Sequence, residues 1–178
     1  MNQSMGGYSP KELTIGNDSQ EKLLHGIEMI SSAVKSTLGP MGQTVIIESP
    51  HHTHGITVTK DGVTVARSYD MADPVGNLAV KMMKEASSRT ATSAGDGTTT
   101  AIVLTEALVK EGLSNITSGV NKTEVLRHLV SETDHLVSEL KENSREVTDK
   151  RLLDVATISA NNDKLIGQII SDCYKEVG

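Results

Sequence analysis

The sequence is poor in aromatic residues: its 178 residues include three Tyr and neither Phe nor Trp. A buried aromatic side chain hides about 150–250 Å² of surface. The core must therefore be built from Val, Ile, Leu, Met and Ala, which is normal for packed helices and unusual for a β-sandwich. The lack of aromatics also excludes the stacking platforms with which many proteins bind single-stranded nucleic acids.

Cysteine, long apolar runs and excess positive charge are also missing. The single cysteine, Cys173, excludes a disulfide framework or a Cys-rich zinc site, and its place in a helical pattern predicts a small core residue. No apolar run reaches the roughly 18 residues that span a membrane, and Met1–Pro10 is unlike a signal peptide. With 17 basic and 23 acidic residues the net charge is −6. We expect a soluble, cytoplasmic protein that binds neither nucleic acid nor membrane.

The apolar spacing predicts a mainly α fold with one small β-hairpin. Helices are expected to begin near Asp18, Asp73, Thr98, Asn121, Asp149 and Asp163. The β-branched runs 44–47 and 56–59 are typical of a hairpin, and 63–66 is expected to add a short strand.

The most informative segment is Gly95-Asp96-Gly97-Thr98-Thr99-Thr100, where a loop becomes a helix. Unpaired N–H groups at a helix start attract anions, and glycines let a phosphate approach closely. A carboxylate there makes sense if Asp96 holds a hard cation such as Mg²⁺, which is usually shared with phosphates. The alternative is that Asp96 is an ordinary N-cap and the threonines only begin the helix.

Two other turns could contribute to a site for a phosphate and a cation. Residues 37–42, Thr-Leu-Gly-Pro-Met-Gly, could pack a rigid loop against a phosphate, and Lys60-Asp61-Gly62 offers a cation and a second carboxylate. Taken alone, these turns are better explained as a helix stop and a surface turn. Neither a Gly-x4-Gly-Lys-Ser/Thr string nor a strand-Gly-x-Gly-x-x-Gly-helix unit is present, so neither a P-loop nor a dinucleotide fold is supported.

Together these motifs resemble the chaperonin family. The string 95–101, with Thr37-Leu38-Gly39-Pro40 and 59–63 upstream and 158–161 downstream, is similar to the bacterial-type (group I) 60 kDa chaperonins, in register from about Ile15 to Gly178. The sequence departs from the family at Met41 and Gln43, where positive charges are usual. It also has an unusual His51-His52-Thr53-His54 tip, for which a solvated loop is favoured over a metal site.

The resemblance implies a site for ATP and Mg²⁺. Asp96 would coordinate the magnesium ion, and Asp61 would help to order the attacking water in a supporting catalytic role. Ile158 and Ser159 would border the pocket from the hinge side. The other nucleotide-binding residues implied are Thr37, Leu38, Gly39, Pro40, Lys60, Gly97, Thr98, Thr99 and Thr100.

The resemblance also implies an organisation and a function. Residues 1–142 correspond to the N-terminal half of an equatorial ATP-binding domain, and 143–178 to the first segment of an intermediate (hinge) domain. The apical domain and the C-terminal equatorial half have no counterpart here. The implied function is ATP-dependent folding of unfolded client proteins in a homo-oligomeric ring, with a co-chaperonin as a further partner. We expect this chain alone to bind Mg-ATP weakly and to hydrolyse little or none.

Two alternatives stay open at this point. The chain could be a non-catalytic chaperonin module that assembles with full-length subunits, with another split half or with itself. It could also be an unrelated Mg-dependent kinase or ATPase with a similar phosphate loop, which the four collinear motifs disfavour.

Overall fold

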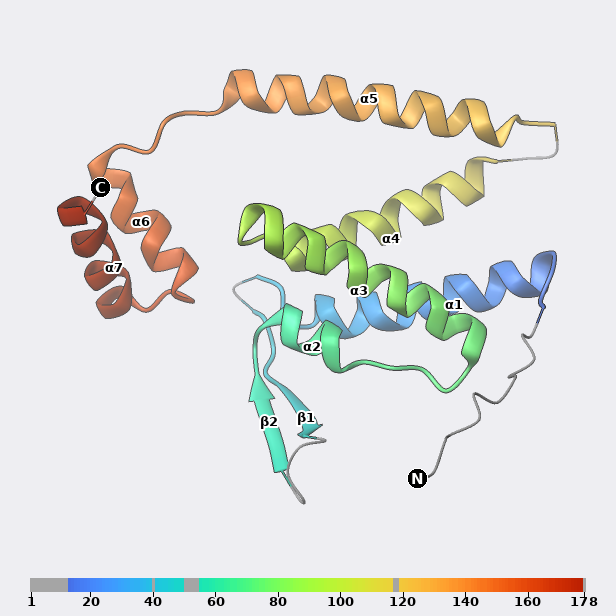
Figure 1. The fold of residues 1–178 in the computed structure, drawn as a ribbon, viewed down its shortest axis with the longest axis horizontal. Helices are drawn as coiled ribbons and strands as arrows, with labels where there is room; N and C mark the ends of the chain where they lie inside the picture. Colours follow the sequence, from blue (N-terminus) through green and yellow to red (C-terminus); the bar gives the residue numbers. More distant parts are fainter. Residues whose placement is uncertain (1–12, 40, 50–54, 117–118, 178) are drawn as a thin grey trace, which may run out of the picture. The chain divides into compact units, whose positions relative to one another are not determined.

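The computed structural model describes residues 13–39, 41–49, 55–116 and 119–177, and divides the chain into two compact units, Met1–Ser118 and Gly119–Gly178. The described residues form seven helices and one two-stranded sheet, which confirms the predicted mainly α class (Figure 1). The assignment of 1–142 and 143–178 to equatorial and intermediate domains stays a prediction. None of the helices formed by these residues combines the length and the apolar character needed to cross a membrane.

Three long helices, α1 (Asn17–Lys35), α3 (Pro74–Ala94) and α4 (Thr98–Asn115), form the body of the first unit. In Figure 1, α1 and α3 both run from right to left, whereas α4 returns from left to right. The C-terminal ends of α1 and α3 and the start of α4 therefore lie at the same end of the unit. This topology decides which loops can form a common site.

The first helix begins one residue before the predicted start near Asp18. The helix begins at Asn17 with Gly16 as its N-cap, and no side chain makes a capping hydrogen bond. Asp18 lies inside the first turn, where its negative charge interacts favourably with the helix dipole and with Lys22, 3.2 Å away. By contrast, Asp73 caps α3 as predicted, with Oδ2 accepting from the backbone N of Gly76 at 2.6 Å.

The predicted hairpin is confirmed as β1 (Val45–Ser49) paired antiparallel with β2 (Gly55–Thr59). The alternation of a strand separates its two faces. Val45 and Ile47 pack against the core, whereas Ile46 and its cross-strand partner Val58 are exposed. The histidine-containing tip 51–54 lies outside the described residues.

The predicted short strand at 63–66 was wrong, because these residues belong to helix α2 (Gly62–Ser68). The β-branched residues Val63, Thr64 and Val65 suggest a strand. However, the carboxylate of Asp61 accepts hydrogen bonds from the backbone N of Val63 and Thr64 and starts a helix instead.

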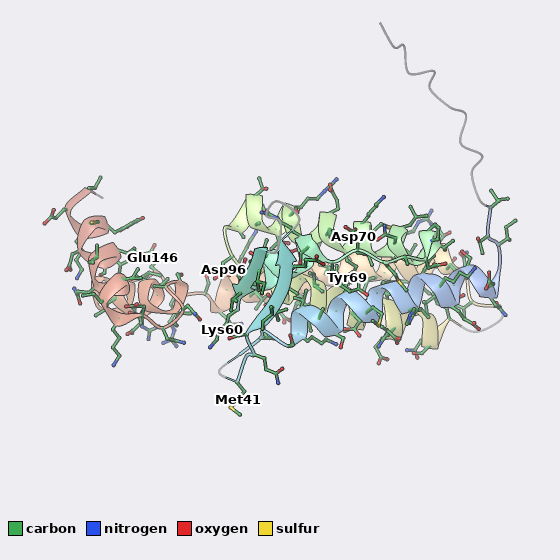
Figure 2. All side chains as sticks on the ribbon, turned by 90° about the horizontal axis from the view of Figure 1, so that it is seen from below. Met41, Lys60, Tyr69, Asp70, Asp96 and Glu146 are labelled. Atoms are coloured by element: carbon green, nitrogen blue, oxygen red, sulfur yellow. The ribbon has the colours of Figure 1, made fainter. Side chains whose placement is uncertain are left out.

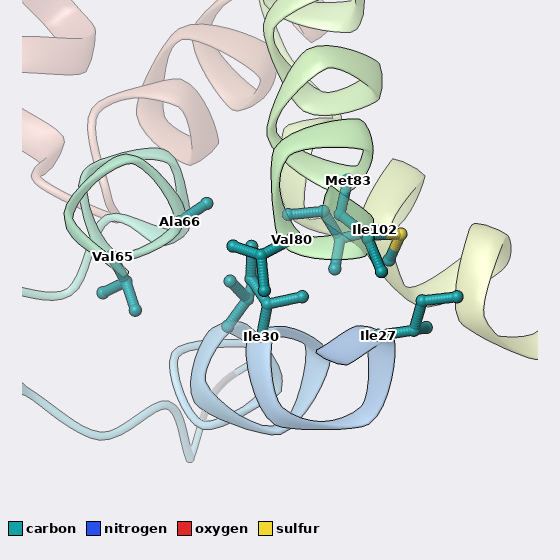
Figure 3. Packing of buried hydrophobic residues seen from close by; sticks show 9 residues of the cluster. Ile27, Ile30, Val65, Ala66, Val80, Met83 and Ile102 are labelled. Carbon is teal, nitrogen blue, oxygen red and sulfur yellow. The ribbon is translucent and has the colours of Figure 1, made fainter. Parts of the chain in front are cut away.

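Aliphatic side chains from four helices form the core of this unit, as Figure 3 shows. Ile30, Val80 and Ile102 are completely inaccessible to solvent and come from α1, α3 and α4. Val65 and Ala66 bring α2 onto the same cluster. The buried core thus contains no aromatic residue among the described residues, as expected, and is formed by packed helices. The remaining buried members are Ile27, Val34, Ala79 and Met83.

A buried carboxylate also joins α1 to α4. Glu106 on α4 is 5% exposed and pairs with Lys35 of α1 and with Lys110, whose Nζ lies 3.0 Å away. Lys110 also pairs with Glu28 of α1 at 2.9 Å. Burial raises the pKa of Glu106, but the hydrogen bonds and charges of the two lysines outweigh it, so the pKa lies below its ordinary value.

The second unit contains α5 (Lys122–Asn143), α6 (Asp149–Ser159) and α7 (Lys164–Val177). Asn121 caps α5 as predicted, with Oδ1 accepting from the backbone N of Thr123 at 3.0 Å. Helices α6 and α7 pack closely at Gly167, where a Cβ would lie 2.7 Å from Cα of Thr157. Cys173 on α7 is exposed, so its prediction as a core residue was wrong.

Candidate functional site

The glycine-rich segment forms the junction between α3 and α4. Gly95 ends α3 in the left-handed conformation (φ 75°), and Gly97 is the N-cap of α4 with φ 83°. Both conformations are costly for residues with a Cβ. No side chain makes a capping hydrogen bond at this helix start. The first-turn N–H groups of α4 are therefore left without an N-cap acceptor.

Asp96 does not cap α4, so the alternative of an ordinary N-cap was wrong. Its Oδ1 accepts from the backbone N of the next residue, Gly97, at 2.6 Å, and the side chain is exposed. The exposed carboxylate thus stands directly before the uncapped helix start. This is an arrangement in which a cation and an anion could be bound side by side.

Asp61 is held rigidly at the start of α2. Its Oδ2 accepts from the backbone N of Thr64 at 2.9 Å and from Thr64 Oγ1 at 2.6 Å, and its Oδ1 accepts from the backbone N of Val63 at 3.2 Å. Partial burial raises the pKa of Asp61, but these hydrogen bonds and the charge of Arg67 outweigh it and hold the pKa below its ordinary value. Asp61 is therefore a fixed carboxylate at neutral pH.

Three motifs that are far apart in sequence meet at Gly62. A Cβ on this residue would overlap with Oγ1 of Thr99 in the first turn of α4, and it would lie 3.2 Å from Oγ1 of Thr37 beyond the end of α1. Three motifs therefore meet around Gly62: Thr-Leu-Gly-Pro, Lys-Asp-Gly and Gly-Asp-Gly-Thr-Thr-Thr. Because Gly62 has no side chain, two hydroxyl groups can approach its backbone.

The loop after α1 is closed by its own hydrogen bonds. Thr37 Oγ1 donates to the carbonyl of Val34 at 2.8 Å, and the backbone N of Gln43 donates to the carbonyl of Ser36 at 2.7 Å. Gly39 has φ 77°, and Leu38 is about half exposed. Pro40, a predicted site residue, lies outside the described residues. Thr37 therefore has a defined position. Nucleotide binding by Leu38, Gly39 and Pro40 stays a prediction.

Lys60 and Asp96 lie at the same end of the first unit, where Figure 2 labels both. Lys60 directly precedes Asp61 and is exposed. The backbone N of Asp61 donates to Oγ1 of Thr59 at 2.9 Å, which fixes the turn from β2 into α2. Thr98 is buried, whereas Thr99 is partly exposed and Thr100 is exposed.

Two predicted site residues belong to the other unit. Ile158 and Ser159 form the last turn of α6 and are exposed. Their membership in the site stays a prediction.

Gly62 and Thr64 were not predicted as site residues. The signal for Thr64 was present: a hydroxyl three residues after an N-cap aspartate can return a hydrogen bond to its carboxylate, as Thr64 does. For Gly62 the sequence predicted only a turn. Its contact with Thr99 depends on how α2 and α4 pack, which the sequence does not show.

Within the described part of the chain, no three His, Cys, Asp or Glu side chains lie close enough together to hold a metal ion by themselves. Mg²⁺ does not need such a cluster, because it commonly binds through one or two carboxylates, with phosphate oxygens and water completing its shell. An exposed aspartate beside an uncapped helix start fits that pattern, so the donor set suits a metal that arrives with a phosphate ligand.

The chain is similar in sequence and structure to known chaperonins. Residues 30–177 match the family model described as the TCP-1/cpn60 chaperonin family. The chaperonin gp146 of bacteriophage EL 2 (Pseudomonas aeruginosa), crystallised in the presence of ATP-BeFx, is 31% identical in two crystal forms. In form II the TM-score is 0.79 and the match covers 91% of this chain; in form I the values are 0.75 and 89%. The chain spans 28% of the gp146 chain in both.

A group III chaperonin in the open state is also similar, with 29% identity and a TM-score of 0.70. The match covers 87% of this chain and 31% of that chain. The similarity to these chaperonins thus extends over nearly all of this chain and under one third of theirs.

Proposed function

Since this chain belongs to the TCP-1/cpn60 chaperonin family, we propose that it is a chaperonin module that binds Mg-ATP where the end of α1 and the starts of α2 and α4 meet. The observation that carries the proposal is the convergence of Thr37 and Thr99 on Gly62. Three separate chain segments form this site, and each carries hydroxyl, N–H or ammonium groups that can bind a phosphate. The crystallisation of the related gp146 with ATP-BeFx supports the same ligand class.

Each residue has a role that follows from its chemistry. The uncapped N–H groups of α4 and the hydroxyls of Thr37 and Thr99 would donate to phosphate oxygens. The exposed Lys60 would add positive charge beside them. The remaining predicted contacts of the pocket, from Leu38, Gly39, Pro40, Gly97, Thr98, Thr100, Ile158 and Ser159, belong to the same proposal.

The two aspartates would act differently. Asp96 would bind Mg²⁺, and the ion would neutralise phosphate charge when bound. Asp61, whose pKa lies below its ordinary value, would accept a hydrogen bond from the attacking water and so orient it. Its fixed position at the start of α2 supports this role, since orienting a water molecule requires a carboxylate that does not move.

The chain by itself should bind weakly and turn over little. It spans 28–31% of the chaperonins it matches, and the catalysis of phosphoryl transfer depends on complete positioning and charge stabilisation. Coupling of hydrolysis to the refolding of client proteins, assembly into a ring, use of a co-chaperonin and a cytoplasmic location are further parts of this proposal.

A non-catalytic module that assembles with full-length subunits or another split half is the second candidate. An apolar groove of about 700 Å³ on the first unit favours it, because this surface suits a protein partner better than solvent. The groove lies between α1, α3 and α4 and includes Leu23, Leu24, Met82, Val109 and Leu113.

Isothermal titration of the full chain with ATP, with and without Mg²⁺, tests the first candidate. We expect saturable binding at high micromolar to millimolar ATP, and we expect Asp96→Asn to remove the part of the affinity that depends on Mg²⁺. Asp134→Asn, on an exposed position of α5, is the matched control and should bind like the wild type. No saturable binding at millimolar Mg-ATP would overturn the proposal. Co-purification with a full-length chaperonin without nucleotide binding would favour the second candidate.

A further inference from the structure

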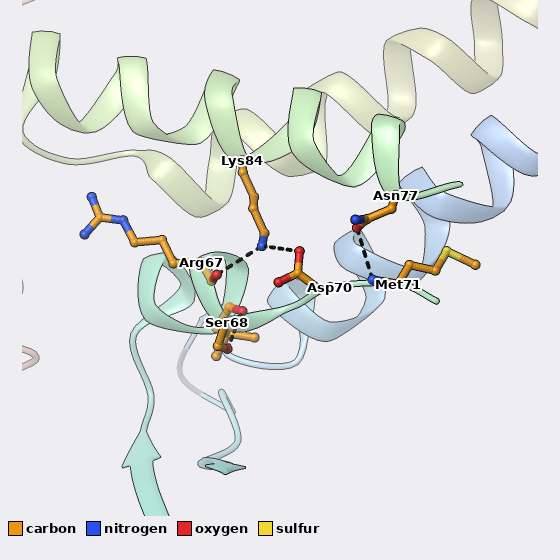
Figure 4. A network of polar contacts seen from close by, with 7 residues as sticks. Arg67, Ser68, Asp70, Met71, Asn77 and Lys84 are labelled. Carbon is orange, nitrogen blue, oxygen red and sulfur yellow. Dashed lines mark hydrogen bonds and ion pairs between the residues drawn. The ribbon is translucent and has the colours of Figure 1, made fainter. Parts of the chain in front are cut away.

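One lysine of α3 holds the far end of α2. Nζ of Lys84 donates to the carbonyl oxygen of Arg67 at 3.0 Å and pairs with Oδ1 of Asp70 at 3.0 Å, as Figure 4 shows. The side chain of Lys84 is 19% exposed, whereas that of Asp70 is 67% exposed. The end of a largely buried side chain thus contacts both the last turn of α2 and the residue that follows its C-cap.

This contact matters because α2 has only seven residues. An isolated helix of that length is not stable in water, so its ends must be held by other groups. Asp61 satisfies N–H groups at the first end. At the second end, Lys84 satisfies a carbonyl that has no partner within the helix and places a positive charge at the negative end of the helix dipole.

The buried hydrophobic contacts of α2 come from two adjacent residues. Val65 and Ala66 are the buried hydrophobic residues of the helix, and both lie in the middle of it. A rotation of α2 about these two side chains would swing its first residue, Gly62. Such a movement would change the close contact between Gly62 and Thr99.

A second anchor lies on the same connection but farther along it. Oδ1 of Asn77 accepts from the backbone N of Met71 at 3.1 Å (Figure 4). This bond holds the loop that leads into α3, and it does not touch α2. The two anchors allow the position of the loop and the position of α2 to be separated experimentally.

We propose that Lys84 is a positioning residue of the candidate site: by holding the C-terminal end of α2, it keeps Asp61 and Gly62 in register with Thr99. The inference rests on the proposed function in one respect: loss of the Lys84 contacts should lower the affinity for Mg-ATP only if the site binds this ligand. Its structural part concerns the nucleotide-free chain and can be tested without any ligand.

The test compares three variants of the full chain by amide hydrogen exchange and by the amide chemical shifts of Gly62 and Thr99. Lys84→Met keeps the aliphatic stem and removes the donor. We expect amide exchange in α2 to become faster by about tenfold, since a hydrogen bond to a charged group is lost. The amide signals of Gly62 and Thr99 should move. Lys81→Met, at an exposed position of α3, and Asn77→Ala should leave both readouts unchanged.

Rescue and ligand binding complete the design. Lys84→Arg can still donate to a carbonyl and a carboxylate, and should restore slow exchange and the original shifts. Where the wild type binds Mg-ATP, Lys84→Met should weaken the affinity several-fold. A wild type that binds no Mg-ATP would refute the proposed function, while the exchange and shift data would still decide the role of Lys84.

Three results would overturn the inference. The first is exchange in α2 that is the same in Lys84→Met and Lys81→Met. The second is exchange that is faster by the same factor in α1, α3 and α4 as in α2, which indicates only a loss of global stability. The third is local loosening of α2 without any movement of the Gly62 and Thr99 signals.

Discussion

Gly62 at the start of α2 lies so close to Thr99 in the first turn of α4 that a Cβ on Gly62 would overlap with the threonine hydroxyl. This contact joins two segments that are 37 positions apart, and it brings the hydroxyl of Thr37 to the same point. Position 62 requires glycine because a side chain there would overlap with Thr99. The first prediction tests this contact directly.

Gly62→Ala should disrupt the site. The added methyl group must displace Thr99 or α2, and overpacking of this kind costs about 1–3 kcal/mol. We expect the affinity for Mg-ATP to fall about tenfold, which corresponds to about 1.4 kcal/mol. Gly112→Ala in α4 is the matched control, because nothing lies within 4 Å of its Cβ position. That control should be more stable by about 0.5–1 kcal/mol, since alanine favours a helix. Calorimetry and urea unfolding measure both effects, and a Gly62→Ala variant with wild-type affinity would contradict the prediction.

Asp61 should show two separable roles. Asn is a good N-cap, whereas Ala is not, so Asp61→Ala should destabilise the protein by about 1 kcal/mol more than Asp61→Asn. Both variants should lose whatever phosphate release the wild-type chain shows, since neither carries the carboxylate that would orient water. Urea unfolding and radiolabelled phosphate release distinguish the roles.

The control for Asp61 is Asp73→Asn, which changes the cap of α3 at the other end of the unit. It should leave phosphate release unchanged. Equal stability of Asp61→Ala and Asp61→Asn would contradict the prediction that an N-cap acceptor at position 61 stabilises α2.

The sequence predicted local features well and features that depend on packing poorly. The caps Asp73 and Asn121 were predicted because an N-cap and its N–H partners lie within three residues of each other. Helix α2 was missed because Val63, Thr64 and Val65 favour a strand, and the capping bonds of Asp61 outweigh that preference.

Burial could not be predicted from periodicity alone. Helix α5 has an apolar stripe, yet none of its residues is buried, and the apolar pattern of α7 leaves Cys173 exposed. A stripe tells which side of a helix is apolar but not what covers it. In the same way, the three motifs of the candidate site were visible in the sequence, while their meeting at Gly62 depends on how α1, α2 and α4 pack.

Glu106 should make the stability of the first unit depend on pH. Its pKa in the folded state lies below the ordinary value of 4.5. A depressed pKa means that the stabilisation is fully present above the unfolded value and is lost as the pH falls from about 4.5 through the folded pKa. Glu106→Gln should cost about 1–3 kcal/mol at pH 7, because the hydrogen bonds to Lys35 and Lys110 lose their charge. The difference from the wild type should shrink as the pH falls below 4.5.

Urea unfolding of both proteins between pH 7 and pH 3 measures this difference. Glu111→Gln, at an exposed position of the same helix, should differ little from the wild type at any pH in this range. A Glu106→Gln deficit that stays constant down to pH 3 would show that the ion pairs do not account for it.

Gly167→Ala should separate α6 from α7 and affect the second unit alone. A Cβ at this position would lie 2.7 Å from Cα and 2.9 Å from the backbone N of Thr157. Backbone atoms cannot move aside as the end of a flexible side chain can, so the two helices must shift apart, at a cost of about 1–3 kcal/mol. Amide exchange should become faster in α6 and α7 and stay unchanged in α1, α3 and α4, which belong to the other compact unit. The exposed neighbour Gln168 provides the control, because Gln168→Ala adds no atom to the contact. Faster exchange in α1 as well as in α7 would show that the two units do not unfold separately.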